Sequence, residues 1–148
     1  MVSVIYEDTP RYDTLLKAIM VLPVFFIIVG AYYLATTEVE ASISMFAAAI
    51  LMGAVYWAIF PRKYQVLDSR IRIVLGGPFN FDIPFDNVET ARKPEGISLG
   101  IKFATCFSGK NTVEIIRKRG MRVAITPGDR DLFLDNLNQV LNDWRGHK

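Results

Sequence analysis

The sequence predicts a membrane α-helical hairpin followed by a small soluble domain of the α+β or all-β class. Two uncharged apolar runs, residues 18–35 and 41–60, contain 18 and 20 residues. At about 1.5 Å of rise per residue, a helix of this length crosses a hydrocarbon core of about 30 Å. After residue 63 the apolar residues recur at every second position, which is typical of strands. The final segment instead has apolar spacings of three and four, which are typical of an amphipathic helix.

The first predicted element is a transmembrane hairpin over residues 15–60, with helices at about 15–35 and 41–60. Five residues separate the apolar runs, so the two helices must be antiparallel neighbours. The acidic residues before the first run, and its ending in Tyr32-Tyr33-Leu34-Ala35, do not fit a cleaved signal peptide. We therefore expect both helices to be retained anchors, and we expect Pro23 to kink the first one.

The distribution of basic residues predicts the orientation. Two basic residues precede the first helix and two follow the second, Arg62 and Lys63, whereas the loop between the helices has none. Lys and Arg are enriched on cytoplasmic flanks of membrane helices. Residues 1–14 are therefore expected to be a short cytoplasmic segment and residues 61–148 a cytoplasmic domain. Both termini would lie inside a cell membrane, which we expect to be a prokaryotic inner membrane.

Small residues in the second helix suggest a packing face. They form two pairs with a spacing of four positions, Ala49 with Gly53 and Ala54 with Ala58. Such spacing lets helices approach closely within a bilayer. Two uses remain open: packing against the first helix, or contact with a membrane-protein partner or a second copy of the chain. The predicted helices contain no charged residue beyond Lys17 near the start of the first, so a transporter or channel acting alone is not expected.

Turn residues divide the soluble part into seven short predicted strands and one helix. The strands are expected at residues 64–66, 71–75, 81–83, 88–92, 97–107, 112–117 and 121–125. Gly120 lies in the last hairpin turn and is expected to have a positive φ. The helix is expected over about 127–144, with Thr126 as its cap and Pro127 in its first position. Its predicted core-facing stripe comprises Leu132, Phe133, Leu137, Val140, Leu141 and Trp144.

Several segments resemble a known family. They are Tyr64-Gln-Val, Ile71-Arg-Ile, Ile83-Pro-Phe-Asp-Asn-Val-Glu, Val123-Ala-Ile-Thr-Pro-Gly-Asp and Phe133-Leu-Asp-Asn-Leu. This pattern resembles the bacterial PH-like (pleckstrin-homology-like) domain family of small membrane proteins, in which one or two transmembrane helices commonly precede the domain. The resemblance implies a PH-like seven-stranded barrel with a C-terminal capping helix over residues 61–148. It also implies binding rather than catalysis.

The residues give little support for catalysis. His147 and Cys106 are the only histidine and cysteine, so we predict no catalytic, cofactor-binding or metal-binding residue. Gly76-Gly77-Pro78 lacks the lysine of a phosphate-binding loop and is interpreted as a turn. Asp82 and Asp86 are interpreted as solvated turn residues. We expect no enzymatic activity.

The basic residues provide the remaining functional hint. Residues 61–148 carry 15 Lys and Arg against 10 Asp and Glu, a net charge of +5. Candidate contacts with anionic lipid head groups are Arg62, Lys63, Arg70, Arg72, Arg117, Lys118 and Arg119. The alternative is a solvated basic face; nucleic-acid binding is not expected. The first function hypothesis is a non-enzymatic scaffold for a protein partner at the cytoplasmic membrane face. The alternatives are an anionic-lipid sensor and an accessory subunit of a membrane enzyme complex.

Overall fold

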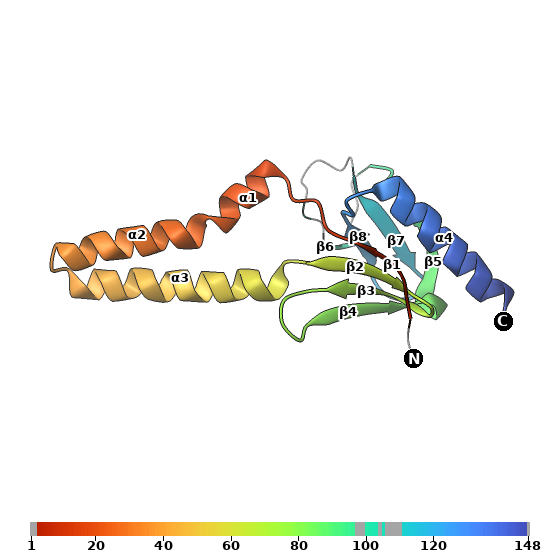
Figure 1. Ribbon diagram of the computed structural model, residues 1–148, viewed down its shortest axis with the longest axis horizontal. Helices are drawn as coiled ribbons and strands as arrows, with labels where there is room; N and C mark the ends of the chain where they lie inside the picture. The colour runs from red at the N-terminus through yellow and green to blue at the C-terminus, as the bar shows by residue number, and fades with distance from the viewer. Residues whose placement is uncertain (1–2, 97–99, 104, 106–110, 148) are drawn as a thin grey trace. The chain divides into compact units, whose positions relative to one another are not determined.

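The computed structural model describes residues 3–96, 100–103, 105 and 111–147, and its chain forms two compact units (Figure 1). One unit is Asp13–Ile59, which holds the long apolar helices. The other unit combines the chain up to Tyr12 with the chain from Phe60 onward. The segment before the helices thus belongs to the soluble fold, which the sequence analysis did not anticipate. Each unit is described by itself below.

The helical unit is an antiparallel hairpin. It comprises α1 (Thr14–Met20), α2 (Leu22–Ala35) and α3 (Val39–Ile59), and α2 and α3 lie side by side along their lengths (Figure 1). Thr14–Ala35 and Val39–Ile59 have mean hydropathies of 2.3 and 1.8 and are long enough to cross a membrane. Two long apolar helices therefore lie where the sequence predicts them.

The first helical stretch is interrupted at Val21, two residues before Pro23. The N–H of Val21 donates to the carbonyls of Ala18 and Ile19 and ends α1. Pro23 then lies in the first turn of α2, where a residue without an N–H is tolerated. Further inside a continuous helix, its ring would clash with the carbonyl of Ile19, four residues earlier. The expected disruption of the first helix by Pro23 is confirmed.

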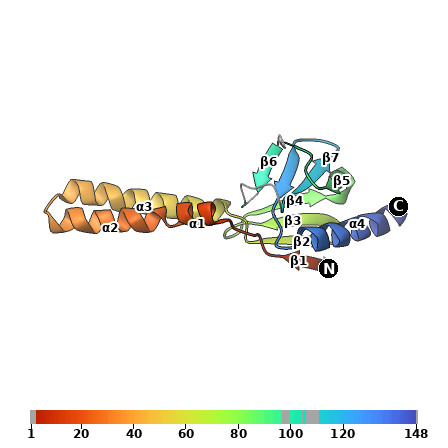
Figure 2. The ribbon, with the colours of Figure 1, turned by 90° about the horizontal axis from the view of Figure 1, so that it is seen from above.

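The second unit contains two four-stranded sheets and a C-terminal helix (Figure 2). The first sheet is antiparallel and has the order β1 (Val4–Asp8), β2 (Lys63–Leu67), β3 (Arg70–Val74), β4 (Asn80–Pro84). A short 3-10 helix, η1 (Phe85–Asn87), leads into the second sheet. That sheet has the order β5 (Val88–Arg92), β7 (Val113–Arg117), β8 (Arg122–Ile125), β6 (Gly100–Phe103). The helix α4 spans Arg130–Gly146.

The closed seven-stranded barrel is not what the described residues form. They form eight strands in two separate sheets, and the added strand is β1. A bulge at Ile5 breaks the pairing of β1 with β2, so the alternation that marks the other strands is lost here. The expected strand 97–107 is represented by β6, which pairs in parallel with β8. Residues 97–99, 104 and 106–107 lie outside the described part.

Buried apolar side chains from both sheets and α4 form one core. The largest are Tyr64, Phe85, Phe133, Ile71, Ile73, Ile83, Ile115, Ile125 and Leu137. Most of the predicted stripe of α4 faces this core, but Leu132 is 49% exposed, and that prediction is wrong. Leu134 is buried in its place, because α4 meets the core along the line Phe133, Leu134, Leu137 and Leu141.

The predicted start of the last helix is also wrong. Asp129, not Thr126, is the N-cap, and its side chain accepts a hydrogen bond from the N–H of Leu132. Thr126 stays extended because its groups are used elsewhere: its hydroxyl accepts from the N–H of Thr105 at 2.7 Å, and its carbonyl accepts from the N–H of Arg11 at 3.0 Å. Pro127 forms an isolated bridge with Pro10. The Thr-Pro segment therefore pairs with the N-terminal segment before α4 begins.

Candidate functional site

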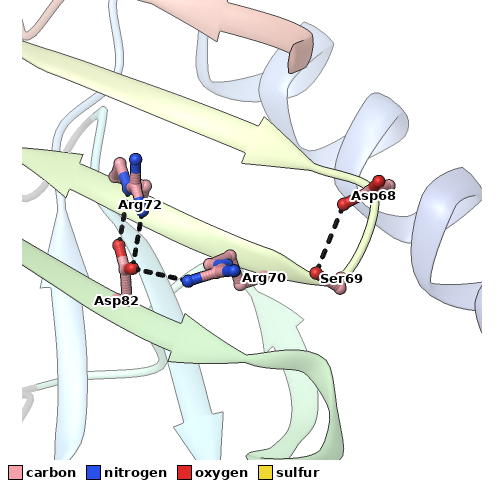
Figure 3. A network of polar contacts seen from close by, with 5 residues as sticks. All are labelled: Asp68, Ser69, Arg70, Arg72 and Asp82. Atoms are coloured by element: carbon pink, nitrogen blue, oxygen red, sulfur yellow. Dashed lines mark hydrogen bonds and ion pairs between the residues drawn. The ribbon is translucent and has the colours of Figure 1, made fainter. Parts of the chain in front are cut away.

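Two of the predicted basic residues meet one carboxylate on the first sheet (Figure 3). Arg72 in β3 lies opposite Asp82 in β4 and donates from Nε to Oδ1 at 2.8 Å and from Nη2 to Oδ2 at 2.9 Å. Arg70 reaches the same Oδ2 from Nη1 at 3.0 Å. Hydrogen bonding from Arg72, supported by Arg70, lowers the pKa of Asp82. Asp82 is exposed, as expected, but it lies in β4 and not in a turn, and it is paired with two arginines.

Lys63, another of the predicted basic residues, is also paired with a carboxylate. Its Nζ lies 2.7 Å from Oε1 of Glu7 on β1, and Nε2 of Gln65 donates to Oε2 at 2.7 Å. These two contacts lower the pKa of Glu7, the Lys63 contact contributing most. Its neighbour Arg62 follows the helical unit directly, and the Arg62 N–H donates to the carbonyl of Val74 at 2.7 Å. The positive charge of Lys63 at the start of β2 is thus balanced by the carboxylate of Glu7 on β1.

Of the remaining three basic residues, Arg117 ends β7, and Lys118 and Arg119 lie in the β7–β8 turn. Arg117 donates from Nε to the carbonyl of Met121 at 2.6 Å, and its guanidinium lies 5.8 Å from the ring centre of Phe81. Asn87 holds the turn by accepting from the N–H groups of Lys118 and Arg119, both at 2.8 Å. Gly120 has a φ of 99°, so its expected positive φ is confirmed. A shallow cavity of about 400 Å³ lies against Asp86, Asn87, Lys118 and Arg119.

The seven basic residues are distributed from one end of the first sheet to the other. Arg62 and Lys63 lie beside Val74, at the end of β3. The β7–β8 turn lies beside Asn87, which follows the opposite end of the sheet, where Pro84 pairs with Arg70. Five-residue strands separate these ends by about 13 Å or more. That distance exceeds the Debye length of about 8 Å at physiological salt, so direct interaction between the charges of Lys63 and Lys118 is largely screened. The Arg117 guanidinium, in contrast, reaches back over Phe81, which pairs with Ile73 near the Val74 end.

The predicted small residues of α3 have different environments. Ala49 is buried in the helical hairpin, Ala58 is half-buried and Ala54 is exposed. A Cβ built at Gly53 would meet no atom within 4 Å. The predicted packing between the two helices therefore involves Ala49, and the exposed positions leave a partner contact open.

A close contact between α2 and α3 joins Gly30 and Ser42, which were not among the predicted packing residues. The Ser42 hydroxyl donates to the carbonyl of Gly30 at 2.9 Å in a buried position. A Cβ at Gly30 would lie only 3.1 Å from the Phe46 ring and 3.3 Å from the Met45 Cβ. A polar residue inside an apolar run is the signal that marks such a contact, because a hydroxyl buried among apolar side chains needs a hydrogen-bond partner.

A groove runs between α4, β1 and the β2–β3 turn. It has a volume of about 510 Å³ and is lined by Ile5, Asp68, Asn136, Gln139, Val140, Asp143, Trp144 and His147. α4 lies beside β1 in both views of the molecule (Figures 1 and 2). Val140 and Trp144 belong to the stripe predicted to pack on the sheet, for which a groove-binding helix was the second interpretation. Both are only half-buried and form the apolar part of this groove.

One acidic side chain is buried on the second sheet. Glu114 in β7 is 2% exposed, and its carboxylate lies 3.4 Å from Arg122 and 3.6 Å from Arg92. Arg92 also reaches Glu95 at 3.3 Å. Burial of a charge is costly unless opposite charges compensate it, and Arg92 and Arg122 supply those charges for Glu114.

Chemistry-bearing clusters are otherwise sparse in the part of the chain that the structure describes. Within it, no three His, Cys, Asp or Glu side chains are grouped so as to hold a metal ion. Comparisons with protein-family models, curated proteins and solved structures found no match to this chain. The features of this chain that bear on its function are therefore the groove, the paired basic residues and the apolar helices.

Proposed function

We propose that this chain is a membrane-anchored binding module that presents a PH-like domain to a protein partner at the cytoplasmic face. The observation that carries the binding proposal is the groove beside α4. It joins an apolar floor to polar rims within one small domain, which is the common composition of a recognition site. The two sheets and the C-terminal helix support the PH-like assignment.

The exposure of the apolar helices supports anchoring in a membrane. Only 11% of each candidate spanning window is buried within the protein. Helices in the core of a soluble protein would be mostly buried. Water-exposed apolar surface of this extent is unfavourable, at about 25 cal/mol per Å², and a bilayer removes that cost. The basic flanks support cytoplasmic termini, as expected from the positive-inside rule.

Cysteine labelling tests the anchoring and the orientation together. In a Cys106→Ser background, we expect Thr37→Cys to react with a membrane-impermeant maleimide in intact cells. Asp135→Cys, an exposed position on α4, should react only after permeabilisation. The reverse pattern would overturn the orientation, and release of the protein by alkaline carbonate would overturn the anchoring.

Native purification tests the partner. We expect the chain, extracted in mild detergent, to migrate as a complex with another membrane protein or with a second copy. Recovery of a lone monomer under several gentle conditions would contradict the proposal. An enzyme found in the complex would identify this chain as an accessory subunit.

Anionic-lipid sensing is the weaker candidate. Lys63, Arg70 and Arg72 are paired with carboxylates of the same domain, which reduces the charge they offer to a lipid surface. The β7–β8 turn contributes further charge, but from the opposite end of the sheet. The lipid candidate predicts that salt strongly changes the contact between this turn and anionic vesicles.

A further inference from the structure

We propose that the groove beside α4 binds an extended peptide segment of a partner protein in which Lys or Arg alternates with apolar residues. This inference rests on the proposed binding function and specifies the chemistry of the partner. Three properties of the groove point to such a segment: its apolar floor, its negative rim and its length.

The apolar floor combines a fixed aromatic ring with exposed aliphatic side chains. Trp144 is held by an edge-to-face contact with Phe85, with ring centres 5.9 Å apart. Ile5 lies across the groove and is 49% exposed, and Val140 lies one turn before Trp144. A preformed aromatic surface of this kind suits an apolar side chain, because little conformational entropy is lost on binding.

The rim of the groove is negative although the domain is basic. Asp68 lies at the β2–β3 turn (Figure 3), and Asp143 lies in the last turn of α4. Among the described residues, those that line the groove include no Lys or Arg. The C-terminal end of α4 adds negative potential through its last carbonyls. These groups favour a cationic side chain in the groove.

The basic residue of the last turn of α4 does not cancel this potential. Arg145 is directed to β5, where its Nη2 donates to the carbonyls of Val88 at 3.2 Å and Glu89 at 2.7 Å. These bonds hold its charge on the opposite side of α4 from Asp143. The same bonds occupy carbonyls at the edge of the second sheet, which makes that edge less available to a peptide.

The dimensions match a short extended segment. From Asn136 to His147 the helix wall rises about 16 Å, at about 1.5 Å per residue. Five extended residues cover about the same length, at about 3.3 Å per residue. The other wall is β1, which pairs with β2 on one side and with no strand on its other side among the described residues. An edge strand of this kind offers backbone groups to an extended partner.

The test uses the full chain in phosphatidylcholine vesicles, whose head groups carry no net charge and so do not attract a basic probe. The probe is the acetylated octapeptide (Val-Lys)₄, and (Val-Glu)₄ is its matched control. In a Trp57→Phe background the only tryptophan is Trp144, so its fluorescence reports on the groove. We expect a saturable change with (Val-Lys)₄ and none with (Val-Glu)₄ or with protein-free vesicles.

Variants of the rim separate this site from non-specific attraction. Asp143→Asn and Asp68→Asn should each weaken binding of (Val-Lys)₄ about fivefold, as loss of one partly exposed charge contact implies. Asp135→Asn removes the same charge from α4 outside the groove and should leave binding unchanged. Equal binding of both peptides, or equal effects of all three variants, would overturn the inference. A partner recovered by native purification without any binding of (Val-Lys)₄ would leave the proposed function standing and reject the basic segment.

Discussion

Arg72 binds both carboxylate oxygens of Asp82 across β3 and β4, at 2.8 and 2.9 Å. Planar guanidinium and carboxylate groups match each other in this bidentate arrangement, which makes it stronger than a single exposed ion pair. Arg70 supplies a third bond to the same carboxylate. Asp82 is thus the shared partner of the two arginines that the sequence analysis considered for lipid contact.

Asp82→Asn should lower the free energy of unfolding of the domain by about 1 kcal/mol at neutral pH. The Arg72 contact holds the pKa of Asp82 below its ordinary value. Its contribution is therefore present above the unfolded-state pKa and is lost as the pH falls through the lower folded-state pKa. The difference between the two proteins should shrink at acidic pH, as measured by denaturant unfolding with Trp144 fluorescence in the Trp57→Phe background.

Arg72→Lys is the matched variant, because it keeps the charge and loses the bidentate geometry. We expect it to have a smaller effect than Asp82→Asn. Equal stability of the wild type and Asp82→Asn at all pH values would show that the pair contributes nothing.

Gly30→Ala should destabilise the helical hairpin, whereas Gly53→Ala should not. A Cβ at Gly30 would lie 3.1 Å from the Phe46 ring, but one at Gly53 would meet no atom within 4 Å. Overpacking of a close contact costs about 1–3 kcal/mol, while replacing an uncrowded helical glycine gains up to about 1 kcal/mol. The two variants should therefore differ by at least about 1 kcal/mol.

This difference can be measured by unfolding the hairpin with SDS in mixed micelles. Dyes at Thr14→Cys and Ile59→Cys, in a Cys106→Ser background, report the separation of the helix ends by energy transfer. Identical midpoints for Gly30→Ala and Gly53→Ala would contradict the packing of Gly30 against α3.

Gly128→Ala should loosen β1 from the domain. A Cβ at this position would lie 2.9 Å from Oδ1 of Asp8 and 3.1 Å from the carbonyl oxygen of Thr9. The N-terminal segment must then shift, and amide hydrogen exchange in Tyr6 and Glu7 should become faster. Gly146→Ala is the control, because nothing lies within 4 Å of its added Cβ, and unchanged exchange in both variants would reject the contact.

A fragment that starts at Pro61 should be less stable than the domain in the full chain, because it lacks β1. Tyr6 of β1 packs edge-to-face on Phe133 with ring centres 6.0 Å apart, and Glu7 pairs with Lys63. A synthetic peptide of residues 3–12 should restore part of the lost stability. Thermal unfolding of the fragment with and without this peptide measures the effect, and a scrambled peptide is the control.

The elements that are determined by residues close to them in the sequence were predictable. The two apolar helices, the interruption at Pro23 and the positive φ of Gly120 each follow from a local pattern or a local steric rule. β1 was not predictable in this way, because the Lys63 partner of Glu7 is 56 residues away. The cap at Thr126 was predicted wrongly since its hydroxyl bonds to Thr105, a tertiary contact that no local motif contains.

The candidate site was harder to predict than the fold. The groove is lined by Ile5, Asp68 and the second half of α4, which are three segments that only the folded chain brings together. Trp144 fits the apolar period of α4, so the period alone cannot separate a core residue from a groove residue. The basic residues were found from composition, but their carboxylate partners depend on strand register.

The position of β1 also determines the order in which the protein can be completed during synthesis. β1 leaves the ribosome first, yet its partner β2 emerges only after both long helices have been made. Until then the edge of β1, with Val4 and Ile5, has no strand from this chain to pair with. The first sheet can therefore close only after the helical hairpin has left the ribosome, so that synthesis of the hairpin precedes assembly of the domain.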